Sequence, residues 1–239
     1  MTQIHQVTGR EEASIPQFIE TTKQIRKSLT EPITYRDLRK KAIRETLVGI
    51  TDKNAVEECY EAWVQERHAA AERFLYDDAI ETLSLLRQTY PDACLAAITN
   101  GAGNPLLMPS LTNHFDLRVS GEDDDVFPHR KPHSYIYEHT LQKADFQGVW
   151  CHVGDCLAND VGASAAVGAH AIWLCTDDDE ESAARRLIDT SKVPEWSTAS
   201  TAELEKRALQ VEQGKAVVAA KINSLSELPD AIEQILNTV

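Results

Sequence analysis

The sequence has no paired-cysteine motif and no long apolar run. Its five cysteines are scattered without a CxxC pair, and an odd number of this kind predicts reduced thiols rather than a disulfide framework. No stretch approaches the roughly 20 apolar residues that a membrane-spanning helix needs. Residues 1–14 lack the charged-then-apolar order of a secretory signal. Together these absences favour a cytoplasmic protein.

Basic residues are scarce. The chain of 239 residues carries 24 Lys and Arg against 38 Asp and Glu, a net charge of −14. Such a charge argues against nucleic acid or an anionic membrane as a partner. An anionic substrate would need a metal ion or local cations to reverse the field at its site. The acidic run at residues 177–181 lacks the spaced ligands and central glycine of a calcium loop, so we interpret it as solvated charge.

The first part of the chain lacks any strand pattern. Up to residue 72, apolar residues recur at helical spacing, and Thr34 with Asp37 forms a capping box. From residue 73 short apolar runs alternate with helical stretches, which predicts an α/β unit with a parallel sheet over residues 73–239, with a polar insertion at about 176–215. The expected strands are residues 94–99, 116–121, 148–154 and 169–175, with one more strand and a final helix near the end.

Polar residues follow two of these expected strands, where ligands gather in parallel α/β sheets. The tripeptide Thr99-Asn100-Gly101 offers a hydroxyl and backbone N–H groups for phosphate oxygens, but it is equally typical of a strand that leaves through an Asn-Gly turn. Lys131, followed by a proline, precedes an expected helix over residues 133–143. Its ammonium can neutralise a phosphate or a carboxylate, although a Lys-Pro pair is also common at helix starts.

The most informative pattern begins at the end of the strand over residues 148–154. Asp155 lies at the strand tip, and Asp160 follows five residues later in the first turn of the next helix. This spacing predicts two carboxylates on one wall of a crevice, as the hard Mg²⁺ ion requires. The alternative is that both aspartates cap a helix. Cys156 has no histidine partner at a defined position, so we interpret it as an inert thiol.

Taken in order, Thr99-Asn100-Gly101, Lys131 and the Asp155/Asp160 pair resemble the second, third and fourth motifs of haloacid-dehalogenase (HAD) superfamily hydrolases. The resemblance implies an α-helical cap over residues 1–72, a Rossmann-like core over 73–239 and a closing strand near 216–222. It implies that the tripeptide binds a phosphoryl group, that Lys131 is the catalytic cation, that Asp155 binds Mg²⁺ and that Asp160 supports the metal shell.

The sequence Gly-Asp-Cys-Leu-Ala-Asn-Asp resembles the fourth motif of HAD phosphatases. Dehalogenases of the superfamily carry a Ser-Asn type instead and need no metal. The expected substrate is therefore a small phosphorylated metabolite. Sugar phosphates, nucleotides and phosphoglycolate all remain open, because cap side chains set the specificity.

One departure from the family is large. Its first motif is a strand ending in Asp-x-Asp-x-Thr, whose first aspartate attacks phosphorus and whose second acts as acid and base. Residues 1–10 contain no aspartate, and the earliest, Asp37, falls on an expected helix. The resemblance therefore predicts a sheet without its first, central strand, and a gap beside residues 148–154.

Three interpretations stay open. The chain is a magnesium-dependent phosphomonoesterase of the family that is truncated at its start and inactive as given. Alternatively, it is a non-catalytic HAD-like protein that binds a phosphorylated ligand or a protein partner. A purely structural interaction module is the third.

Overall fold

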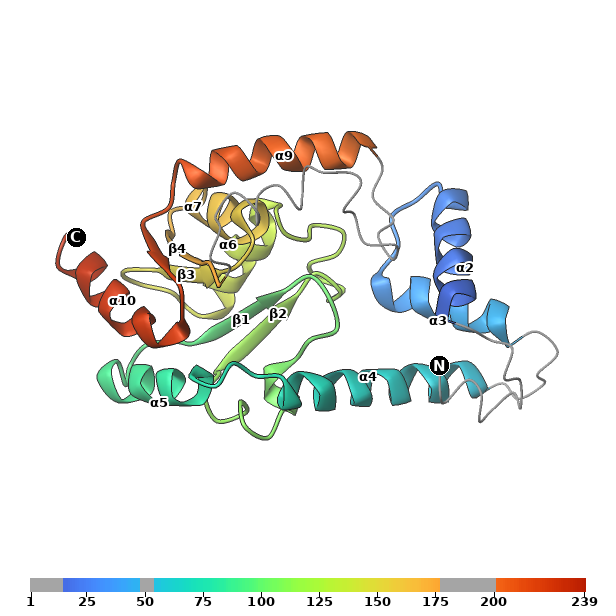
Figure 1. Cartoon of the computed structure of the whole chain (residues 1–239), viewed down its shortest axis with the longest axis horizontal. Helices are drawn as coiled ribbons and strands as arrows, with labels where there is room; N and C mark the ends of the chain where they lie inside the picture. Colours follow the sequence, from blue (N-terminus) through green and yellow to red (C-terminus); the bar gives the residue numbers. More distant parts are fainter. Residues whose placement is uncertain (1–14, 48–53, 177–200) are drawn as a thin grey trace.

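The computed structural model describes residues 15–47, 54–176 and 201–239, so the acidic run at 177–181 lies outside the described residues. The first part of the chain forms helices α2 (Ile15–Ser28), α3 (Tyr35–Thr46) and α4 (Ala55–Arg73). Their shared apolar cluster is formed by Ile43, Leu47, Ala55, Cys59 and Tyr60. These helices lie to one side of the sheets, with α4 running back toward them (Figure 1).

The first N–H groups of α3 are capped by one residue that is close in the sequence and by one that is distant. The Thr34 hydroxyl oxygen accepts a hydrogen bond from the Asp37 N–H at 2.9 Å, which confirms Thr34 as the N-cap. The N–H groups of Tyr35 and Arg36 donate to the two carboxylate oxygens of Glu122, at 3.0 and 2.7 Å. Glu122 follows a strand of the α/β unit, so that unit itself satisfies the open N–H groups of the helix.

Arg130 completes this attachment of the helices to the α/β unit. Its Nη2 lies 2.6 Å from Glu122 Oε1 and donates to the Ile33 carbonyl at 3.0 Å. The guanidinium also lies over the Tyr35 ring, 3.8 Å from its centre. Gly121 makes room for this arginine, since a Cβ there would lie 2.5 Å from Arg130 Cγ.

Replacing Glu122 should loosen this attachment. Glu122→Ala is expected to lower the free energy of unfolding by about 3 kcal/mol, because it leaves the half-buried Arg130 charge and two helix N–H groups without their acceptor. Urea denaturation measures the change. Asp124→Ala is the matched control, since the Asp124 side chain is 97% exposed and lies 3.7 Å from Arg36, an exposed pair worth under about 1 kcal/mol. Equal losses in both variants would contradict the assignment.

Every strand that the sequence predicts is present in the α/β unit. In chain order its elements are α5 (Ala79–Thr89), β1 (Ala96–Thr99), η1 (Pro105–Leu107), β2 (Leu117–Ser120), α6 (Ser134–Lys143), β3 (Cys151–Gly154), η2 (Leu157–Gly162), α7 (Ala163–Ala165), β4 (His170–Leu174), α9 (Thr201–Lys215), β5 (Ala220–Ile222), η4 (Leu225–Glu227) and α10 (Leu228–Leu236). Strands alternate with helices, which is the mixed α/β organisation expected.

The strands of the described residues form two parallel sheets rather than one. β1 pairs with β2, and β3, β4 and β5 pair in that order, all in parallel. Among the described strands no ladder joins β1 to β3, which is the side of residues 148–154 where the sequence predicts a gap. Figure 1 shows the two sheets as separate ribbons.

β4 carries the centre of the larger sheet, and every residue from Ala171 to Leu174 is buried. Trp173 packs toward η2 and Val211 of α9, whereas Ile172 packs toward α5 and Ile235 of α10. Figure 1 shows α9 on one side of β4 and α10 on the other. A strand covered on both faces explains its continuous apolar run.

The described end of the expected polar insertion, residues 201–215, is helix α9. Its Gly214 lies directly against the backbone of Leu157 in η2, so closely that a Cβ would clash with the Leu157 carbonyl. This part of the chain is therefore packed on the core.

Among the helices of the described residues, none has the length and apolarity that crossing a membrane requires.

Candidate functional site

The predicted site residues meet at the carboxyl ends of β1 and β3. Lys131, in the loop before α6, reaches between them. Its Nζ donates to the Ile98 carbonyl of β1 at 3.0 Å and to Asp160 Oδ1, after β3, at 2.6 Å. The Lys131 side chain is only 13% exposed and that of Asp160 only 8%. One ammonium therefore connects the ends of the two sheets.

Asn100 holds Lys131 in this position. Its Nδ2 donates to the Lys131 carbonyl at 2.9 Å, and the Lys131 N–H donates to Asn100 Oδ1 at 2.7 Å. Both polar atoms of the Asn100 side-chain amide therefore hydrogen-bond to the backbone of Lys131, which makes Asn100 a positioning residue for Lys131. The neighbouring Thr99 hydroxyl oxygen accepts from the Gly101 N–H at 3.2 Å. The tripeptide and Lys131, 31 residues apart, form one unit.

Asp160 is placed by a close approach that only glycine allows. It lies in η2, a π-helical turn after β3, and its side chain packs on Gly154, where a Cβ would lie 2.5 Å from Asp160 Cγ. Its Oδ2 accepts from the Cys156 N–H at 3.2 Å. Together with Lys131 on Oδ1, both carboxylate oxygens are therefore engaged.

The Asp160 carboxyl is held in its charged form. Burial raises its pKa, whereas His152 and the Lys131 ammonium lower it, and the resulting pKa is about 2. Of these two groups, Lys131 makes the closer contact with Asp160. Its Nζ lies 2.6 Å from Asp160 Oδ1, whereas His152 Nε2 lies 3.6 Å from the same oxygen. A distance of 3.6 Å is too long for a normal hydrogen bond.

Asp155 has a different environment. It lies at the end of β3 and is exposed. Its backbone carbonyl accepts from Trp173 Nε1 at 3.2 Å, but its carboxylate accepts no hydrogen bond from the described residues. The two aspartates, expected as a pair on one wall, are thus a free carboxylate and a carboxylate engaged with Lys131.

These environments decide how the site would hold a metal. Mg²⁺ is usually bound by one or two carboxylates together with water and substrate phosphate oxygens. The exposed Asp155 fits such a ligand, whereas Asp160 fits the role of a support for Lys131. Within residues 15–47, 54–176 and 201–239, no group of three or more His, Cys, Asp or Glu side chains could hold a metal ion by itself.

Two histidines near the site were not singled out by sequence reasoning. His152 of β3 faces Asp160 and meets the Tyr137 ring edge-on at 5.4 Å between centres. His68 of α4 is buried, and its Nε2 accepts from the Asn104 N–H at 3.1 Å, which ties the helical part to the loop after Gly101. His152 could have been found by its place two residues before Gly154, whereas His68 carries no local signal because its partner is 36 residues away.

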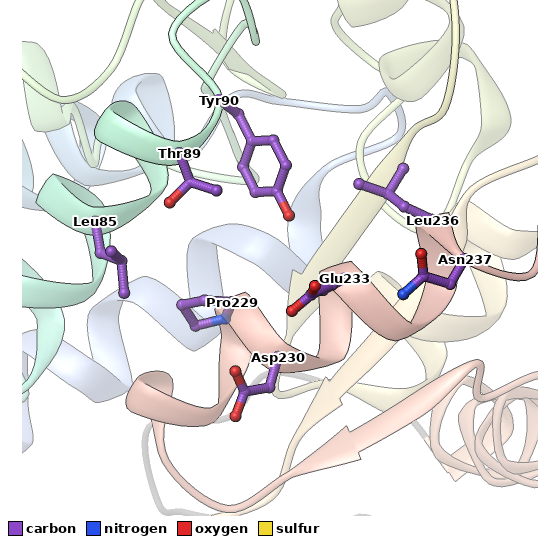
Figure 2. A pocket seen from close by; sticks show the side chains of 8 residues that line it. All are labelled: Leu85, Thr89, Tyr90, Pro229, Asp230, Glu233, Leu236 and Asn237. Carbon is purple, nitrogen blue, oxygen red and sulfur yellow. The ribbon is translucent and has the colours of Figure 1, made fainter.

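Two hollows of the surface lie away from this site. Figure 2 shows one between α5 and α10, where Asp230 and Glu233 lie opposite Leu85 and Tyr90. Another lies along α4, beside Met108. Neither is lined by a predicted site residue, so convergence of polar groups at the strand ends, rather than a hollow, locates the site.

No family model matches the chain, and no curated protein matches its sequence. Solved structures do match. A 2-haloacid dehalogenase from Pseudomonas syringae pv. Tomato DC3000 superposes with a TM-score of 0.65 at 18% identity, covering 98% of this chain and 89% of that one. An L-2-haloacid dehalogenase from Xanthobacter autotrophicus has a TM-score of 0.49 at 17% identity, covering 98% and 93%.

A HAD phosphatase from Thermococcus onnurineus has a TM-score of 0.47 at 19% identity, covering 91% of this chain and 87% of that one. At sequence identities this low, a structural match is evidence for a shared fold and not for a shared reaction. The first superposition shows that the chain has the HAD-like α/β fold, as its motifs predicted.

Proposed function

We propose that this chain is a HAD-like hydrolase whose site is built for a phosphomonoester of a small metabolite, with Mg²⁺ as cofactor. The observation that supports it best is the Lys131 ammonium, held between Ile98 and Asp160 next to the Thr99-Asn100-Gly101 loop. A nearly buried cation beside the Thr99 hydroxyl is an arrangement suited to phosphate oxygens.

Each residue has a distinct part in this proposal. Lys131 and the Thr99 hydroxyl contact phosphoryl oxygens, and Asn100 and Asp160 keep Lys131 in place through the contacts described above. Asp155 holds Mg²⁺, which neutralises phosphate charge in a chain of net charge −14. The Gly-Asp sequence at the end of β3 favours phosphatase over dehalogenase chemistry. The scattered free cysteines fit a cytoplasmic location, which we include in the proposal.

The described residues provide binding groups but no attacking group. The sequence contains no Asp-x-Asp-x-Thr, and Asp160 is committed to Lys131 while Asp155 is the metal ligand of this proposal. We therefore expect the chain as given to bind a phosphate group with Mg²⁺ and not to hydrolyse its ester. Hydrolysis needs a further carboxylate.

Asp155→Asn tests the binding site without disturbing the fold. Inorganic phosphate is expected to bind the wild-type chain saturably in the presence of Mg²⁺, and the variant is expected to bind at least tenfold more weakly, because it lacks the charge that holds the metal. Titration calorimetry with and without Mg²⁺ measures both affinities. The melting temperature should stay unchanged, since the side chain is exposed.

Asp145→Asn, on an exposed turn after α6, is the control for the loss of one negative charge. Phosphate binding that does not depend on Mg²⁺, or an equal loss in both variants, would overturn the assigned role of Asp155.

A further inference from the structure

The helical part of the chain contains a cluster of aromatic rings and arginines that the proposed phosphate site does not use. Its centre is Trp63 of α4. The guanidinium carbon of Arg39, on α3, lies over the Trp63 ring, 3.9 Å from its centre, and over the Phe18 ring of α2 at 5.7 Å. The guanidinium carbon of Arg67 lies over the same Trp63 ring at 5.7 Å. Three helices therefore bring two arginines to one ring.

The arrangement follows from helical spacing and from the packing of α3 on α4. Trp63 and Arg67 belong to one helix at positions i and i+4, which places them on the same face of α4. Arg39 reaches this face from α3, which packs beside α4 through the apolar cluster around Ile43 and Tyr60. The two guanidinium groups thus lie close together because of the tertiary structure and not because of their order in the chain.

Neither guanidinium has an acidic partner. Within the part of the chain that the structure describes, Arg39 and Arg67 form no ion pair and donate no hydrogen bond. This is unexpected in a chain with 38 acidic residues against 24 basic ones. Glu66, the neighbour of Arg67 in the chain, contacts Arg73 instead, at 2.6 Å. The hydrogen-bond donors of both arginines are therefore unused.

Placing two like charges at one ring is unfavourable. Burial lowers the pKa of Arg39, and the nearby Arg67 charge lowers it further, because both disfavour the charged form. The cation–π contact explains why one guanidinium lies on Trp63, but it does not explain why a second cation lies over the same ring. An anion bound to both groups would replace their repulsion by attraction.

The donors of both arginines are accessible to a ligand. No nitrogen of Arg39 is among the buried side-chain atoms that lack a partner, so its free donors reach solvent, and Arg67 is exposed. A guanidinium that stacks on a ring uses its face, and the N–H groups at its edge stay free for the two oxygens of an acid group. Because the rings fix the plane of Arg39, these donors are ordered before a ligand arrives.

The rings also favour one kind of acid group. A carboxylate is planar and can lie in the plane of the Arg39 guanidinium, parallel to the Trp63 ring. A tetrahedral phosphate that uses the same edge projects its remaining oxygens out of this plane, toward the apolar faces of Trp63 and Phe18, where they find no donor. Two guanidinium groups can hold two carboxylates, one bidentate pair each.

We propose that Arg39, Arg67 and Trp63, which we term the arginine site, bind a small organic dicarboxylate. The two guanidinium groups hold the carboxylates, and the Trp63 ring supports the guanidinium of Arg39. The arginine site shares no residue with the phosphate site around Lys131 and needs no Mg²⁺. It is therefore independent of the proposed hydrolase function.

Succinate, titrated into the full chain without Mg²⁺ at low salt, probes the arginine site. Calorimetry is expected to show saturable binding of one succinate per chain. Acetate reaches only one guanidinium, so it should bind at least about tenfold more weakly. Inorganic phosphate should also bind at least about tenfold more weakly, because it does not match the plane of the donors.

Variants locate the binding on the chain. Arg67→Gln removes one guanidinium at an exposed position and is expected to weaken succinate binding at least about tenfold without changing the melting temperature. Arg39→Gln should weaken it similarly, but it also removes packing on Trp63, so Arg67→Gln is the deciding variant. Arg44→Gln is the matched control, since it removes the same charge from an exposed position of α3 and should bind succinate like the wild type.

Several results would overturn the proposal. One is the absence of saturable succinate binding by the wild-type chain. Another is equal binding by Arg67→Gln and the wild type, or an equal loss in Arg67→Gln and Arg44→Gln, which would indicate a general effect of charge. Phosphate that binds as tightly as succinate without Mg²⁺ would contradict the assignment of a dicarboxylate.

Discussion

Incubated with an aryl phosphate and Mg²⁺ at neutral pH, this chain is expected to release phosphate no faster than the uncatalysed reaction. The covalent route to hydrolysis begins with attack by a carboxylate on phosphorus. Asp160 is paired with Lys131, both of its oxygens are engaged, and Asp155 is assigned to the metal. Because enzymes accelerate phosphomonoester hydrolysis by factors on the order of 10²¹ in extreme cases, losing the nucleophile has an effect far larger than any binding residue.

The measurement is release of the aryl alcohol, followed for hours at high protein concentration. A contaminating phosphatase is the main source of false activity, so the assay is repeated after a second purification. Turnover that survives repurification and disappears in Asp155→Asn would contradict the prediction, because it would show that the described groups are sufficient for the reaction.

The second large effect is on stability. Lys131→Met is expected to lower the free energy of unfolding by about 3–5 kcal/mol, because it leaves the Asp160 charge buried without its ammonium partner. The variant also removes the donor to the Ile98 carbonyl. Urea denaturation with a two-state fit measures the loss.

A double variant separates the charge from the packing. In Lys131→Met with Asp160→Leu, both members of the buried pair are replaced by apolar side chains of similar length, and most of the lost stability should return. A Lys131→Met variant within about 1 kcal/mol of the wild type would show that the pair is solvated, which contradicts its exposures of 13% and 8%. Because this variant alters folding, Asp155 is the better residue for binding experiments.

The secondary structure was largely predictable because its signals are local. The apolar run from residue 169 to 175 became β4 because a strand covered on both faces has no polar positions. The capping role of Thr34 likewise depends only on a residue three positions away. The second acceptor at this helix start, Glu122, could not be predicted, since it arrives from 86 residues further along the chain.

The sequence predicted which residues lie at the site better than it predicted which of them contact one another. Thr99, Lys131 and Asp155 were expected at strand ends, where the structure places them, since parallel strands bring their carboxyl ends to one edge. Asp160 was expected beside Asp155 as support for a metal. In the structure its carboxylate contacts Lys131, and its side chain packs on Gly154, which has no Cβ in the way.

By itself, the sequence determined the order of helices and strands, the parallel α/β class and the polar residues at the strand ends. These follow from periodicity and from side-chain chemistry, which are properties of short segments. Only the tertiary structure decided that Lys131 pairs with Asp160, that Glu122 caps α3 and that Asn100 holds the backbone of Lys131. Each of these depends on where distant backbone segments come to lie, and a difference of a few ångströms there decides whether two groups hydrogen-bond or stay apart.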